Sequence, residues 1–283
     1  MKLRWIAAAT LATAGVCGLA TLADAADATD FMPVKAVHAA THNSWNGFYA
    51  GVNAGYGWDS SSIDHSALTP FNYPAAIRNN GIPASNDMSS KGFMGGIQAG
   101  YNYQFGWALF GAETDIAYAG IRGSKVSTTP SGGGPGAVLI TTTENKNLEW
   151  FGTARGRLGV LPTPSMLLYL AGGLAYGKVS ASTTTTVPET AFAGGCSGVF
   201  GGNFFCSAGS DNRWKAGWTI GAGLETMVNG NWSARAEYLY YDLGNISYTS
   251  IATAPAFTGR AVMQSDTRVD GHIIRIGLNY KLY

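Results

Sequence analysis

The sequence lacks a long apolar run beyond its first residues, and it lacks an excess of charge of either sign. After residue 25 the longest apolar run covers residues 166–176 and contains Gly172 and Gly173, whereas a membrane-spanning helix needs roughly 20 apolar residues. The 283-residue chain has a formal net charge of +1. We therefore expect neither a helical membrane protein nor a protein that attracts nucleic acid.

Motifs for phosphate and metal chemistry are missing as well. The glycine-rich segment at residues 131–136 is not followed by Lys-Ser or Lys-Thr, so it does not predict a phosphate-binding loop. His38 and His42 have the spacing of zinc ligands on a helix, but Ala39 stands where a zinc protease needs glutamate. We expect no metal site at these residues.

The first 25 residues predict a secretory signal peptide. Lys2 and Arg4 supply the positive start, residues 5–20 the apolar stretch, and residues 23–25 (Ala-Asp-Ala) the small-residue cleavage pattern. Cleavage would leave equal numbers of basic and acidic side chains. The mature protein is therefore expected outside the cytoplasm with no formal net charge.

Cysteine is scarce, and its positions fit an exported protein. Of the three cysteines, Cys17 lies within the predicted signal peptide and does not predict a lipid anchor. Cys196 and Cys206 remain in an oxidising compartment, and no histidine lies near them in sequence to complete a metal site. We predict a disulfide between them, which by loop entropy would contribute roughly 2–3 kcal/mol.

The sequence is instead rich in segments that alternate apolar and polar residues. In residues 274–282, isoleucine, leucine and tyrosine occupy every even position, and arginine, glycine, asparagine and lysine occupy the odd positions. Such a strand near an aromatic carboxyl terminus is typical of the closing strand of an outer-membrane barrel. Eight segments show this two-faced pattern, namely 47–58, 92–105, 107–118, 147–160, 167–179, 213–228, 232–243 and 268–282.

The predicted fold is therefore all-β: an eight-stranded antiparallel transmembrane β-barrel over residues 45–283, preceded by a periplasmic linker at 26–44. The connections alternate in length, which is the layout of outer-membrane barrels with short periplasmic turns and long extracellular loops. The predicted turns are Gly106, 162–165 and 229–231, and the predicted loops are 59–91, 122–146, 180–212 and 245–267. A soluble β-sandwich is the alternative, but its strands are rarely this long or this rich in outward aromatic residues.

Tryptophan is concentrated near the predicted strand ends. An amphipathic aromatic ring is favourable at the boundary between lipid and water. We therefore predict two aromatic girdles that include Trp45, Trp58, Trp107, Trp150, Trp214 and Trp232.

Charged residues within the predicted strands share the phase opposite to the apolar residues. Four arginines facing lipid would cost on the order of 8–16 kcal/mol, so the charged phase must face the lumen. The predicted lumen network consists of Glu113, Asp115, Arg155, Arg157, Glu225, Arg235, Glu237 and Arg275. Since side chains can fill an eight-stranded barrel, four acids and four bases indicate an ion-paired plug, with a polar permeation path as the alternative.

One ion pair within this network is predicted directly. If the turn centres on Gly230, Glu225 and Arg235 lie opposite each other across a hairpin. We therefore expect them to form a cross-strand ion pair.

Several motifs resemble the small outer-membrane immunogenic proteins of α-proteobacteria, which are barrels related in architecture to the OmpA transmembrane domain. The resembling residues are 26–30 with Pro33 and Lys35, 45–51, 110–115, 149–157, 217–225 and 277–281. This resemblance implies an outer-membrane location and insertion by the barrel-assembly machinery. Members of the family are described as hemin-binding proteins, small porins or surface antigens.

We accordingly expect a non-enzymatic barrel with a structural and surface-interaction role. The expected partners are outer-membrane lipids and host or surface ligands that the loops would bind, and no cofactor is expected. The alternatives are a narrow porin and a hemin-binding protein that uses loop residues such as Tyr73 and His65. A lipid hydrolase with His272 and Asp242 on its lipid face is a further alternative, although no nucleophile is assigned to it.

Overall fold

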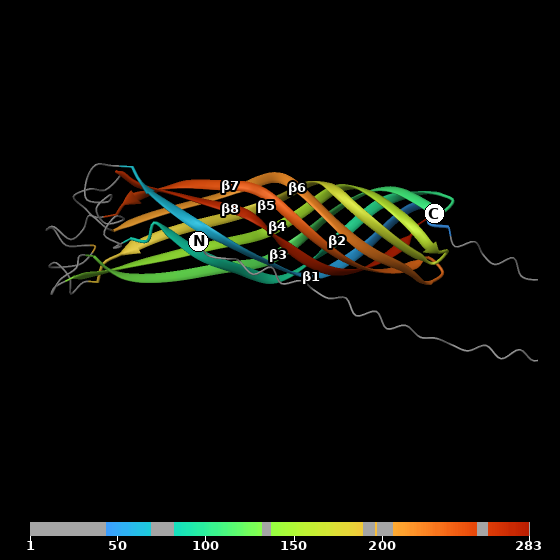
Figure 1. The fold of residues 1–283 in the computed structure, drawn as a ribbon, viewed down its shortest axis with the longest axis horizontal. Coiled ribbons are helices and arrows are strands. Elements are labelled where there is room, and N and C mark those ends of the chain that lie inside the picture. Colours follow the sequence, from blue (N-terminus) through green and yellow to red (C-terminus); the bar gives the residue numbers. More distant parts are fainter. Residues whose placement is uncertain are drawn as a thin grey trace, which may run out of the picture. The chain divides into compact units, whose positions relative to one another are not determined.

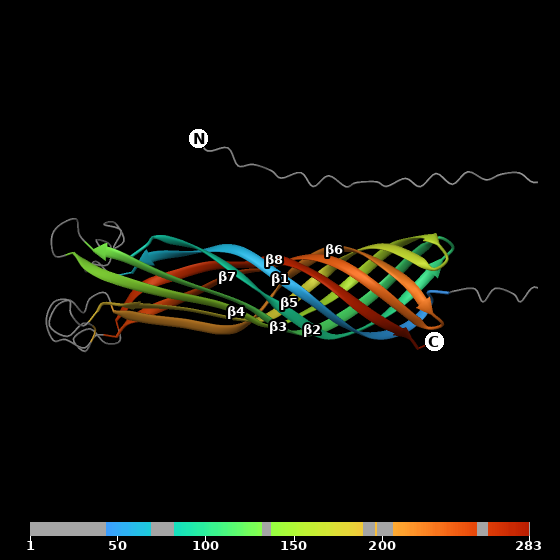
Figure 2. The ribbon, with the colours of Figure 1, turned by 90° about the horizontal axis from the view of Figure 1, so that it is seen from below.

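The computed structural model describes residues 44–68, 82–131, 137–188, 196, 206–253 and 260–282. They form β1 (Gly47–Ala67), β2 (Ser85–Phe105), β3 (Ala108–Ser131), β4 (Val138–Thr163), β5 (Met166–Thr186), β6 (Ser207–Asn229), β7 (Trp232–Ala252) and β8 (Ala261–Lys281). Neighbouring strands pair antiparallel and β8 pairs with β1, so the strands close a barrel (Figures 1 and 2). The predicted all-β class and eight-stranded ring are confirmed.

Two sequence predictions fall largely outside this part of the chain. The predicted signal peptide and residues 26–43 of the predicted linker are not among the described residues. Among those that are, no helix is long and apolar enough to span a membrane.

The short connections lie together with the end of β8 at one end of the barrel, which we call the turn end (Figure 1). Gly106 and Gly230 begin two of these turns, and their φ angles of 59° and 53° lie in the left-handed region. Glycine adopts this region without the steric cost that a Cβ brings. The strand ends that flank the connections β1–β2, β3–β4, β5–β6 and β7–β8 lie at the opposite end, which we call the loop end.

The strands are longer than predicted, because the predicted loops are in large part continued strands. Each strand contains 21–26 residues, and the β3–β4 register continues to Ser131 and Val138. Runs such as residues 60–62 (Ser-Ser-Ser) and 183–186 (Thr-Thr-Thr-Thr) are polar on both faces. In these runs the backbone ladder continues, but the alternation of apolar and polar residues that identifies a half-buried strand is absent.

Two belts of outward aromatic side chains bound an apolar band on the barrel. The turn-end belt includes Phe48, Phe105, Phe110, Trp232 and Tyr280, and the loop-end belt includes Phe93, Tyr118, Trp150 and Trp214, all at least 39% exposed. Along β3 the belts are eight residues apart, from Phe110 to Tyr118, which for a tilted strand corresponds to about 20–25 Å. This matches the apolar band of outer-membrane barrels, so the loop-end parts of the strands extend beyond the membrane.

Trp45 is an exception to the predicted girdles. Its side chain is buried, with its indole Nε1 donating to the Pro164 carbonyl at 3.2 Å. The segment before β1 turns into the barrel mouth, so this ring closes the lumen instead of facing lipid. The prediction of an outward Trp45 is wrong.

Beyond the loop-end belt the paired register of the barrel wall is interrupted along two seams. The β2–β3 register ends at Lys91 and Arg122, and the β6–β7 register is interrupted between Ala208 and Trp218. The registers β3–β4, β4–β5 and β5–β6 continue past this level. The loop-end part therefore consists of two four-stranded sheets, β3–β6 and β7–β8–β1–β2. They join again where β6 pairs with β7 at Ala208–Ile251, and the Ser127 hydroxyl of β3 donates to Asn86 of β2 at 3.1 Å.

Candidate functional site in the barrel lumen

All eight predicted network residues are buried in the lumen, each with at most 3% of its surface exposed. Glu113 and Asp115 come from β3, Arg155 and Arg157 from β4, Glu225 from β6, Arg235 and Glu237 from β7, and Arg275 from β8. On each of these strands the charged residues alternate with lipid-facing residues. Their side chains therefore all point into the barrel lumen. The structure thus gathers the whole predicted set.

Arg155 and Arg275 connect strands that do not neighbour each other. Arg155 donates to Glu113 at 2.6 Å and to Glu237 at 2.8 Å, which links β4 to β3 and, across the lumen, to β7. Arg275 donates to Glu237 at 2.6 Å and to Asp115 at 3.1 Å. Each guanidinium therefore joins carboxylates from different walls of the barrel.

The predicted Glu225–Arg235 ion pair is replaced by pairs with other partners. The two residues are directly opposite in the β6–β7 register, as predicted. Glu225, however, accepts from Arg157 at 2.6 Å, while Arg235 pairs with Glu113 and donates to the Gln98 side chain at 2.7 Å. Both long side chains reach across the narrow lumen, and carboxylates of other strands are within that reach.

Neutral residues that were absent from the predicted set extend the network. The Tyr49 hydroxyl donates to Glu113 at 2.6 Å and accepts from Arg157 at 2.7 Å. Asn279 donates to Glu225 at 2.7 Å, and Gln98 donates to Asn279 at 2.6 Å. These residues share the inward phase of their strands, which is the signal that could have identified them.

An apolar layer lies on the loop-end side of the charged network. The Phe151 ring from β4 meets the Tyr241 ring from β7 at a centroid distance of 4.9 Å, across the barrel interior. Leu239 and Ile273 belong to the same cluster, and neither has exposed surface. An ion that passed the charged residues would have to displace this packed layer.

Buried polar pairs connect the two loop-end sheets. His65 of β1 is bonded through Nε2 to Glu144 of β4 at 2.5 Å and through Nδ1 to Ser265 at 2.9 Å. Tyr248 of β7 bonds Thr183 of β5 at 2.7 Å. Burial raises the pKa of the Tyr248 phenol, and it outweighs the opposing effect of the Thr183 bond. A second apolar cluster, with Ile140, Met263 and Cys206, closes the lumen beyond these pairs.

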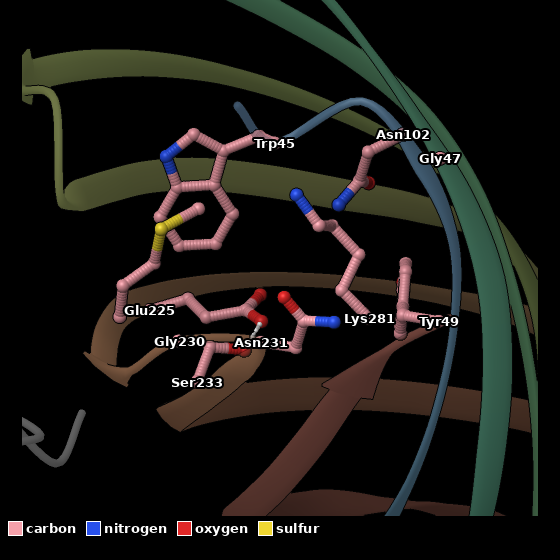
Figure 3. A pocket seen from close by; sticks show the side chains of 10 residues that line it. Trp45, Gly47, Tyr49, Asn102, Glu225, Gly230, Asn231, Ser233 and Lys281 are labelled. Carbon is pink, nitrogen blue, oxygen red and sulfur yellow. Dashed lines mark hydrogen bonds between the residues drawn. The ribbon is translucent and has the colours of Figure 1, made fainter. Parts of the chain in front are cut away.

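The turn-end mouth contains a small cavity of about 20 Å³. Trp45 forms one side of it, and Glu225 lies opposite, where it accepts a hydrogen bond from Ser233 (Figure 3). Lys281 also lines the cavity and donates to the Ser44 carbonyl at 2.7 Å, which ties β8 to the segment before β1. The volume suits a single water molecule and no larger ligand.

Of the candidate residues for a hemin or metal site, the described part of the chain includes His65. His65 lies in β1 and not in a loop, and hydrogen bonds occupy both of its ring nitrogens. Tyr73 lies outside the described residues, as do His38, His42 and residues 132–136. In the described part of the chain, no group of three or more histidine, cysteine or acidic side chains could hold a metal ion.

The proposed His272–Asp242 pair is not formed. The His272 ring stacks on Trp58 and Tyr238, and its Nδ1 bonds the Tyr238 hydroxyl at 2.7 Å. Asp242 instead pairs with Arg268 and accepts from the Gly244 amide at 2.8 Å. His272 therefore belongs to the aromatic belt.

Cys196 and Cys206 form the predicted disulfide, with their Cα atoms 5.7 Å apart. Cys206 belongs to the apolar cluster that closes the loop end, and Cys196 packs against this cluster. The bridge therefore joins the connection between β5 and β6 to the packed interior.

The family of outer-membrane protein β-barrel domains matches residues 31–281 of the chain. The chain belongs to this family. It is 37% identical over 243 residues to the 31 kDa outer-membrane immunogenic protein of Brucella melitensis biotype 1, covering 84% of each protein. It is 31% identical over 163 residues to the 22 kDa outer membrane protein of Rhizobium leguminosarum bv. viciae, covering 58% of each.

Among solved structures, the outer membrane protein OprG from Pseudomonas aeruginosa aligns with a TM-score of 0.45 and 14% identity, over 85% of this chain and 99% of that chain. The family and its named relatives confirm the predicted resemblance and the outer-membrane location.

Proposed function

We propose that this outer-membrane β-barrel is a closed, non-enzymatic barrel with a structural and surface-interaction role. The observation that carries the proposal is the filling of the lumen by successive charged, apolar and polar layers. The arginines in the charged layer pair with carboxylates, and the apolar layer beyond it contains Phe151, Leu239 and Ile273 with no exposed surface. Such a lumen favours a plug over a narrow porin.

The surface role is supported by the strands that extend beyond the loop-end belt. Their outward side chains include Ser60, Asp64, Ser66 and Ser124, all exposed. A relative is named an outer-membrane immunogenic protein, that is, an outer-membrane protein that elicits an immune response. We propose that this chain likewise presents its loop-end strands and connections to the exterior.

Conductance in planar bilayers tests the closed lumen. Purified protein should give no steady conductance, because ions would have to displace packed apolar side chains and separate buried ion pairs. A general porin added afterwards to the same membrane verifies that the membrane reports open channels. Steady unitary conductance that scales with the amount of the purified chain would contradict the plug and favour the narrow porin.

A further inference from the structure

Lys91 and Arg122 form an unusual pair on the outward face of the barrel. They are directly opposite in the β2–β3 register, at its last pair toward the loop end, and both are exposed. Like charges opposite each other on neighbouring strands destabilise a sheet. Among the described residues no carboxylate lies within ion-pairing distance of either, and the interaction found for Arg122 is a 3.4 Å hydrogen bond to the Tyr118 hydroxyl.

Three other cations near this level have acidic partners, and Lys215 of β6 donates to the Asn245 carbonyl at 2.7 Å. Lys178 of β5 donates to Glu149 at 2.8 Å, Arg268 of β8 pairs with Asp242, and Arg213 of β6 pairs with Asp211. The β2–β3 face therefore carries two positive charges that the barrel leaves uncompensated.

The surroundings of the pair change from polar to apolar along the strands. On the loop-end side lie the exposed serines Ser89 and Ser124. On the turn-end side lies Phe93, which is 79% exposed and contacts the Tyr56 ring at 5.1 Å, next to the smooth surface left by Gly120. Hydroxyl groups, cations and apolar rings thus follow one another across the membrane boundary.

We propose that Lys91 and Arg122 bind the anionic headgroup of a glycolipid in the outer leaflet. Its phosphate or carboxylate would lie between the two cations, its sugar would face the serines, and its acyl chains would cover Phe93 and Tyr118. Charge-assisted hydrogen bonds to the headgroup would remove the repulsion between the cations. The proposal rests on the membrane placement of the barrel and is independent of whether the lumen conducts.

Native mass spectrometry of the purified protein in mild detergent tests this site, with a bisphosphorylated diglucosamine lipid as the probe. Wild-type protein should bind one more lipid molecule than the double variant Lys91→Gln/Arg122→Gln, or should bind the lipid at least tenfold more tightly than that variant does. Lys178→Gln is the matched control, because it removes a cation near the same level that already has an acidic partner; its lipid binding should equal that of the wild type. Equal binding by wild type and double variant would overturn the proposal.

Two further measurements distinguish a lipid site from a structural cation pair and from a site for free anions. Without lipid, the double variant should be at least as stable to heat as wild type, because it has lost a repulsion; with lipid, only the wild type should gain stability. A double variant that is less stable without lipid would assign the pair a structural role and overturn the proposal. Inorganic phosphate at millimolar concentration should not displace the lipid, and complete displacement would show a free-anion site in its place.

Discussion

Arg157 shows how a cation is held inside this barrel. Its guanidinium donates to Glu225 at 2.6 Å and to Tyr49 at 2.7 Å, and it lies over the Tyr169 ring at 4.0 Å from the centroid. Removing such a charge from water costs several kcal/mol, which only close opposite charges, hydrogen bonds and an aromatic face together can offset. Breaking any one of these contacts should therefore be costly.

The exchange of partners at Glu225 leads to a testable prediction. Arg157→Gln should destabilise the barrel by about 3–5 kcal/mol, since it leaves the buried Glu225 carboxylate without a cation. Glu225→Gln should cost less, since Arg157 keeps its 3.5 Å contact with Glu113. The double variant should lose less than the sum, with a coupling of at least about 1 kcal/mol. Urea unfolding in lipid vesicles measures these free energies.

The control for this cycle is the pair that faces Glu225 across the hairpin. The coupling between Glu225→Gln and Arg235→Gln should be smaller, because Arg235 bonds Glu113 and Gln98. A larger coupling for Glu225–Arg235 than for Arg157–Glu225 would show that the direct cross-strand pair forms after all.

Tyr248 supplies a prediction about pH beyond the membrane. Its folded-state pKa is raised by burial, so its contribution to stability is complete below the unfolded value of about 10 and is lost as the pH rises through the folded value. The difference in ultraviolet absorbance between wild type and Tyr248→Phe reports ionisation of this phenol. It should therefore change with pH with a midpoint above about 10. A midpoint at the ordinary tyrosine value would mean that the phenol is solvated and the two loop-end sheets are open there.

At the scale of structural elements, the segment that carries Trp45 closes the lumen at the turn end. Trp45→Ala should destabilise the barrel by about 3–5 kcal/mol, because a buried ring and its hydrogen bond to Pro164 are lost. Trp107→Ala is the matched control, since that ring is 71% exposed in the β2–β3 turn and should cost much less. Equal losses in urea unfolding would contradict an interior role for Trp45.

The course of the strands could be predicted only where one face meets lipid. There the requirement for apolar side chains outside and polar ones inside imposes a strict period of two, as in residues 274–282. Beyond the belt both faces tolerate serine and threonine, so residues 60–62 and 183–186 carry no period even though they continue β1 and β5.

For the site, the phase of each strand predicts which side chains enter the lumen but not which ones bond. Arginine spans several possible carboxylates in so narrow a space, and the choice between Glu113 and Glu225 depends on strand stagger around the whole ring. Trp45 had a similar ambiguity, because a tryptophan before the first strand suits a lipid boundary and a barrel mouth equally well.

For the molecule as a whole, the placement of the barrel predicts which side chains face the exterior. In intact cells, a cysteine introduced by Ser60→Cys should react with a membrane-impermeant maleimide, because Ser60 is exposed beyond the loop-end belt. Asn231→Cys, in the exposed β6–β7 turn, should react only after the outer membrane is permeabilised. The reverse pattern of labelling would mean that the barrel has the opposite orientation, and the surface role would then fail.

The pairing of β1 with β8 has a kinetic consequence. It joins Tyr49 to Lys281, so the ring cannot close before nearly the whole chain has been made. The hairpins at Gly106 and Gly230 connect neighbours in sequence and can form early, whereas this last ladder requires the ordering of all eight strands. Until this ladder forms, β1 and β8 are open edges with unpaired amides and carbonyls. In water these groups can pair with other chains, and in the hydrocarbon of the membrane they would remain without hydrogen bonds, which is unfavourable. The unclosed sheet is therefore the folding intermediate most prone to aggregation, and the yield of folded protein depends on how quickly β1 pairs with β8.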